Sequence, residues 1–163
     1  MTLAALRARA LSTLDRFSWI GPFALRLSLG AVFLGTGWGK LHNLGQVTGF
    51  FTELGIPFPG AQAAMVSVVE LLGGGLILLG LFTRFASLPL MAVMAVAILT
   101  AKRPEIDGIR SLLAFQESTY LAGFLWLLVA GPGKASLDAL LFGRSDRVQR
   151  SRGRHGAVPA EQR

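Results

Sequence analysis

Residues 20–41 read IGPFALRLSLGAVFLGTGWGKL, a long apolar run that contains only two charged positions. A transmembrane helix needs about 20 mostly apolar residues to cross roughly 30 Å of hydrocarbon. This run meets that length, and so do residues 63–82, 85–102 and 111–131 farther along the chain. Proline, glycine and charged residues separate the runs, as turns require. The sequence therefore predicts an all-α integral membrane protein, built as a four-helix bundle.

Composition supports a single membrane domain and excludes several kinds of chemistry. Of the 163 residues, 52% are hydrophobic and only 15% are charged, whereas a soluble domain carries about a quarter charged residues. The absence of cysteine excludes disulfides, thiolate metal sites and iron–sulfur clusters within this chain. The two histidines, His42 and His155, fall on opposite sides of the predicted membrane, so we expect no metal site.

The distribution of lysine and arginine predicts that both termini are cytoplasmic, because positive residues gather on the inner side of membrane proteins. We expect a cytoplasmic amphipathic segment at 1–19, the transmembrane domain at 20–142, and a basic, disordered cytoplasmic tail at 143–163. The tail either fixes the topology, which is the simpler interpretation, or binds anionic lipid or an acidic partner. Nucleic acid is not an expected partner, because no basic surface interleaved with aromatic residues lies outside the membrane.

Ionisable residues inside the spans are the main candidates for function. Each costs about 2.5–3.5 kcal/mol to insert, so it normally faces the bundle interior and finds a partner. The helical rise places Glu70 and Glu117 at nearly the same depth, with Lys40 slightly farther out. The same layer includes Thr36, Ser67, Thr100, Gln116, Ser118, Thr119 and Tyr120. This pattern predicts a polar pocket in the outer half of the bundle, although buried Glu–Lys or Glu–Arg pairs can also serve only to hold helices together.

Two features leave alternatives open. Arg26 lies near the inner end of the first span, where it either anchors the helix by reaching toward the surface or pairs with Glu70. The apolar connection at 44–60 carries Phe50, Phe51 and Phe58. It forms either a lid over the outer pocket or a plain surface segment.

Several short motifs, in this order, resemble the DoxX family over residues 26–138. They are RLSLG at 26–30, GWGKL at 37–41, GIPFP at 55–59, VELLGG at 69–74, LGLFTR at 79–84, GPG at 131–133 and SLD at 136–138. The resemblance implies a four-helix protein of the bacterial inner membrane. It also implies a link to redox systems, since relatives named DoxD form the membrane part of a thiosulfate–quinone oxidoreductase. Other relatives are linked to complexes with superoxide dismutase and a thiosulfate sulfurtransferase in oxidative-stress defence. The positions that match the family motifs without an assigned catalytic step are Arg26, Lys40, Glu70, Arg84 and Glu117.

The resulting hypothesis is a membrane subunit of a thiol, sulfur or oxidative-stress redox system. A quinone head group would bind in the outer pocket, with Glu70 and Glu117 as catalytic proton acceptors. Lys40, Arg26 and Tyr120 would bind the cofactor. The chain has no redox-active side chains of its own, so it is an oxidoreductase subunit only through a bound quinone or a soluble redox or sulfurtransferase partner.

Two other functions remain compatible with the sequence. One is a non-catalytic membrane scaffold or assembly factor that recruits a soluble enzyme through the basic tail or the inner helix. The other is transport of a small molecule or ion. Transport would require an oligomer, because four short spans without internal repeats make a poor alternating-access machine.

Overall fold

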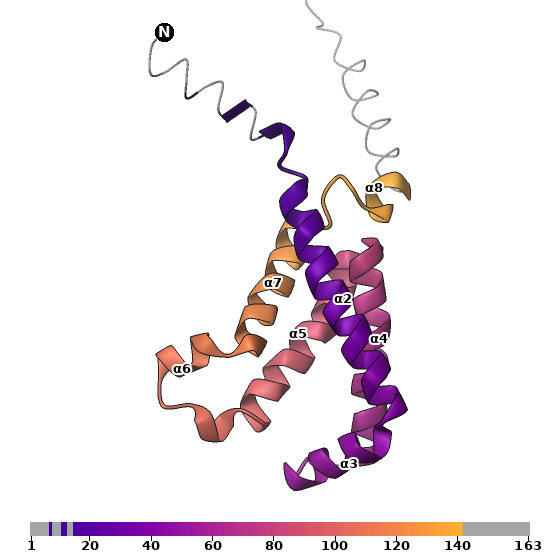
Figure 1. Ribbon diagram of the computed structural model, residues 1–163, viewed down its shortest axis with the longest axis vertical. Helices are drawn as coiled ribbons and strands as arrows, with labels where there is room; N and C mark the ends of the chain where they lie inside the picture. Colours follow the sequence, from indigo (N-terminus) through magenta and orange to yellow (C-terminus); the bar gives the residue numbers. More distant parts are fainter. Residues whose placement is uncertain (1–6, 8–10, 13–14, 142–163) are drawn as a thin grey trace, which may run out of the picture.

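The computed structural model describes residues 7, 11–12 and 15–141. Most of the predicted amphipathic segment at 1–19 and the whole basic tail at 143–163 lie outside the described residues. Within the described part, all regular elements are helical, as predicted. They are α2 (Ile20–His42), α3 (Leu44–Glu53), α4 (Pro59–Leu79), α5 (Thr83–Thr100), η1 (Arg103–Glu105), α6 (Ile109–Ala114), α7 (Gln116–Ala130) and α8 (Leu137–Leu141) (Figure 1).

Three of the described helices, α2, α4 and α5, are long and apolar enough to cross a membrane. The span predicted at 111–131 is instead divided at Phe115, whose backbone is extended (φ −68°, ψ 141°). Here the Ser118 hydroxyl donates to the Leu112 carbonyl at 2.6 Å, and the Phe115 carbonyl accepts the first amides of a new helix. The 15 residues of α7 rise only about 22 Å. A fourth span and cytoplasmic termini therefore stay predictions.

The long helices form two pairs that meet at one end and diverge toward the other. α2 lies along α4, and α5 lies along α7. The pairs come together at the end that carries α8 and separate toward the end that carries α3 and α6 (Figure 1). Where they meet, the buried core comprises Leu29, Phe33, Ile77, Ala86, Leu90, Met94, Phe124 and Leu127. Phe33 packs edge-on against Phe124, with ring centroids 4.9 Å apart, and so joins α2 to α7.

Glycines bring the backbones of α2 and α4 into direct contact. A Cβ atom added to Gly37 of α2 would lie 2.3 Å from the Leu71 nitrogen of α4, and one added to Gly74 of α4 would lie 2.4 Å from the Leu34 nitrogen of α2. Both distances are shorter than any real Cβ contact, so alanine at either position would push the two helices apart. Small residues serve this purpose in membranes, where packing rather than the hydrophobic effect holds helices together.

We predict that Gly37→Ala destabilises the protein, because the added methyl group collides with the α4 backbone, which cannot move aside as a flexible side chain does. The expected loss of unfolding free energy is about 1–3 kcal/mol, the typical cost of overpacking. Thermal unfolding of the detergent-solubilised protein measures it. Gly35→Ala is the matched control, because nothing lies within 4 Å of a Cβ atom there. Equal unfolding temperatures for the two variants would contradict the glycine contact.

Candidate functional site

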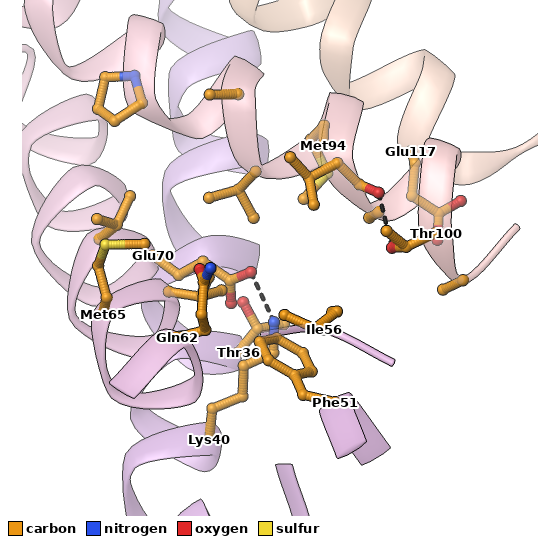
Figure 2. A pocket seen from close by; sticks show the side chains of 18 of the residues that line it. Thr36, Lys40, Phe51, Ile56, Gln62, Met65, Glu70, Met94, Thr100 and Glu117 are labelled. Carbon is orange, nitrogen blue, oxygen red and sulfur yellow. Dashed lines mark hydrogen bonds and ion pairs between the residues drawn. The ribbon is translucent and has the colours of Figure 1, made fainter. Parts of the chain in front are cut away.

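A cavity of about 610 Å³ lies between the diverging helix pairs. Its size falls in the range of small-molecule binding sites, about 300–1,000 Å³. Helices α2, α3, α4, α5 and α7 all contribute to its walls, which are mostly aliphatic and aromatic (Figure 2). The polar residues of the lining are Thr36, Lys40, Gln62, Glu70, Thr100, Glu117 and Tyr120. The cavity thus combines an apolar wall with a few polar groups, as sites for small organic ligands do.

An ion pair between α2 and α4 is the strongest polar feature of this cavity. The Lys40 ammonium donates to Oε1 of Glu70 at 2.6 Å (Figure 2). Glu70 is almost completely buried, whereas the Lys40 side chain remains one-third exposed. The second carboxylate oxygen, Oε2, is also buried, and no described residue hydrogen-bonds it. A buried acceptor without a donor costs about 1–3 kcal/mol or more when charged, so Oε2 is an unsatisfied group at the edge of this cavity.

Glu117 and Tyr120 reach the same cavity from α7. Glu117 lies across the cavity from Glu70, near Thr100 (Figure 2). It occupies the first turn of α7, where the positive end of the helix dipole favours a carboxylate. The Tyr120 ring packs edge-on against Phe33, and its hydroxyl accepts a hydrogen bond from the Gln116 amide. The structure therefore brings Lys40, Glu70, Glu117 and Tyr120 together, while their catalytic and cofactor-binding roles stay predictions.

Arg26 does not line the cavity and does not pair with Glu70. It is buried at the opposite end of α2, where its guanidinium donates to four backbone carbonyls. These are Ile77 at 3.1 Å, Leu78 at 3.2 Å, Pro132 at 2.9 Å and Ala135 at 2.7 Å. The last carbonyls of a helix have no intrahelical donors, and inside a membrane water does not replace them. Arg26 therefore satisfies carbonyls at the end of α4, away from the cavity, and its cofactor-binding role stays a prediction.

The contacts of Arg26 belong to a larger group that we call the Arg26 clasp, formed by Arg26, Gly80 and Asp138. Gly80 ends α4 in the left-handed conformation (φ +68°), and a Cβ atom there would lie 2.4 Å from the Arg26 Cζ. The Asp138 carboxylate accepts the amides of Phe82 at 2.8 Å and Thr83 at 3.2 Å, at the start of α5. The Asp138 amide donates back to the Gly80 carbonyl at 2.9 Å. The clasp thus joins α2, α4, α5 and α8.

The structure also places residues in the cavity that the sequence analysis missed or left open. Gln62 lines it because α4 begins at Pro59, four residues before the predicted start, and proline at the first helical position was the available signal. Phe50, Phe51 and Ile56 line it from α3 and the following connection, so this segment covers the cavity rather than lying apart from it. Ser67, by contrast, is not in the lining and bonds the Ala63 carbonyl of its own helix.

Comparison with known proteins identifies related membrane proteins. A family model described as DoxX matches residues 21–103. The chain is 29% identical to the inner membrane protein YqjF of Escherichia coli over 122 residues, covering 75% of this chain and 92% of that protein. It is 36% identical to the membrane protein Rv3486 of Mycobacterium tuberculosis over 132 residues, covering 74% and 81%. It is 31% identical over 83 residues to the Bacillus subtilis protein named "Putative oxidoreductase CatD", covering 51% and 60%. No solved structure matches the chain.

We predict that Arg26→Lys destabilises the protein even though it keeps the positive charge. A lysine ammonium lacks the planar fork of a guanidinium and cannot reach four carbonyls at once, so buried acceptors lose their donors. The expected loss of unfolding free energy is about 2–4 kcal/mol, measured by thermal unfolding in detergent.

Arg84→Lys is the matched control for this prediction. The Arg84 guanidinium bonds the Val129 carbonyl at 3.2 Å in an exposed position, so its replacement should cost less than about 1 kcal/mol. A stability loss no larger for Arg26→Lys than for Arg84→Lys would contradict the structural role of Arg26.

Proposed function

Since the chain belongs to the DoxX family, we propose that it is the membrane subunit of a redox system and binds the head group of a quinone in the cavity. The protein is a multi-pass protein of the bacterial inner membrane. The membrane-spanning helices α2, α4 and α5 all line the cavity, which places it within reach of lipid-soluble molecules. The oxidoreductase name carried by the relative CatD supports a redox role.

The observation that carries the proposal is the Lys40–Glu70 pair in an otherwise apolar cavity, with Glu70 Oε2 unpartnered. A quinone head group is a flat apolar ring with oxygens on opposite edges, so it needs apolar walls and hydrogen-bond donors. The Lys40 ammonium has three protons, of which the ion pair uses one. Oε2 of Glu70 is an acceptor for a ring hydroxyl or its proton. The cavity residues therefore fit this group in both apolar surface and hydrogen bonding.

Each polar residue then has a defined task. Lys40 donates a hydrogen bond to a ring oxygen and orients the ring beside Glu70. Glu70 accepts or returns a proton at Oε2, and Glu117 holds a second carboxylate on the opposite wall. The bound quinone supplies the two-electron chemistry that the side chains of the chain lack. Electrons would come from a partner, for which a soluble redox or sulfurtransferase enzyme is the class that the redox role implies.

We predict that Glu70→Gln weakens quinone binding strongly while the helices stay folded. The amide has the shape of the carboxylate but cannot accept a proton, and Lys40 is exposed enough to remain solvated without its partner. A hydrogen bond to a charged group contributes about 1.5–3 kcal/mol, so bound quinone should fall at least about tenfold. Mass spectrometry of the protein extracted in native lipid patches reports bound quinone and co-purifying proteins together.

Glu105→Gln is the matched control for this measurement. Glu105 pairs with Lys102 at 3.1 Å on the exposed η1 segment, and it does not line the cavity. Its replacement should leave bound quinone unchanged. Equal quinone in Glu70→Gln and wild type would contradict the site. Wild-type protein that carries a soluble enzyme but no quinone would contradict the redox role and support the scaffold function instead.

A further inference from the structure

We propose that the ligand of this cavity enters sideways from the bilayer, through an opening between α4 and α5, with its tail left in the lipid. The site therefore takes a quinone with a long isoprenoid tail rather than a water-soluble one. This inference rests on the proposed function, and it names both the route and the ligand class for the same site.

Residues that belong to the cavity lining and are also exposed mark its rim, and on the sides of α4 and α5 they are Met65, Pro89, Ala92 and Val96. Thr36, Phe50 and Pro57 are exposed lining residues elsewhere on the rim. Met65 of α4 is 56% exposed, and Val96 of α5 is 52% exposed. A side chain that touches both the cavity and the exterior lies at the rim between them. Both helices are long and apolar enough to span the membrane, so this rim faces hydrocarbon rather than water.

Short side chains on the α5 wall of the cavity help to keep the opening between α4 and α5 unfilled. On this wall, Ala92, Ala97 and Ala101 present short side chains between the larger Val93, Met94 and Val96. The two helices pack together from the Gly80 turn to the contact between Gly73 and Leu90, and they separate toward the end with α3 and α6 (Figure 1). A gap between diverging helices with small side chains on one face stays available to a flexible apolar tail.

The end of the cavity beside Lys40 is partly covered. Phe51 and Ile56 lie beside Lys40 at that end of the cavity (Figure 2), and Phe50 and Leu54 add to the same cover. A head group that reaches Lys40 and Glu70 from this side passes these apolar side chains, of which Phe50 is 48% exposed. The lateral opening, in contrast, lets the tail of the ligand remain in lipid.

The experiment compares two quinones with the same head group, one with a single isoprenoid unit and one with eight units. Binding of each to the protein in lipid nanodiscs is measured for wild type, Met65→Trp and Val96→Trp. A tryptophan at the rim narrows the opening without touching Lys40 or Glu70. Leu72→Trp and Leu99→Trp are the matched controls, because both residues are exposed on the same helices, at 61% and 66%, but neither lines the cavity.

We expect the rim variants to weaken binding of the long-tailed quinone at least about fivefold, since overpacking of this size commonly has such a cost. The short-tailed quinone should bind within about twofold of wild type, which also shows that the variants are folded. Equal losses for both quinones, or no change for either, would overturn lateral entry and leave the quinone site standing. If neither quinone binds to wild type, the proposed function fails, and this inference fails with it.

Discussion

The arrangement of the helices depends on the hydrogen bonds that the Arg26 guanidinium donates to backbone carbonyls. A buried cation in the bilayer is costly unless it is fully hydrogen-bonded, and the last carbonyls of a helix are costly unless they find donors. Arg26 avoids both costs, because its guanidinium donates hydrogen bonds to carbonyls at the end of α4 and in the loop at 131–136. Asp138 extends the same group to the start of α5. Hydrogen bonds between these two side chains and backbone groups thus hold α2, the end of α4, the start of α5 and the loop at 131–136 together at one end of the bundle.

The helix pairs are joined at the end that carries α8 and diverge toward the end that carries α3 and α6. α2 and α4 stay in contact along their length because glycines let their backbones touch, whereas α4 and α5 pack together only from the Gly80 turn to Gly73 and Leu90 and then diverge. The resulting space is a cavity with five helices around it, not a defect of packing. Lys40, Glu70 and Glu117 lie outside the buried core, whereas Tyr120 packs against its residue Phe33.

The Lys40–Glu70 pair has a different meaning from the Arg26 clasp. Replacing a buried ion pair with apolar residues is often neutral or stabilising, so an ion pair is weak evidence for a role in stability. This pair also leaves Oε2 of Glu70 without a donor among the described residues, whereas the four hydrogen bonds of Arg26 all go to backbone carbonyls. The motifs that resemble the DoxX family therefore divide into two groups. One builds the closed end of the bundle, and the other presents hydrogen-bonding groups to the cavity.

The sequence by itself determined the membrane class, three of the spans, and the common depth of all the polar lining residues except Gln62, because these follow from the length of the apolar runs and the helical rise. Only the tertiary structure decided that Arg26 turns to carbonyl groups rather than to Glu70, since rotation about the helix axis and the location of unpaired backbone groups follow from packing. The break at Phe115 had a local signal in the polar run 116–119, which is typical of a helix start. Mean hydropathy over a window as long as a membrane span does not show so short a run. The opening between α4 and α5 had none, because it arises from the divergence of two helices that look equally apolar along their whole length.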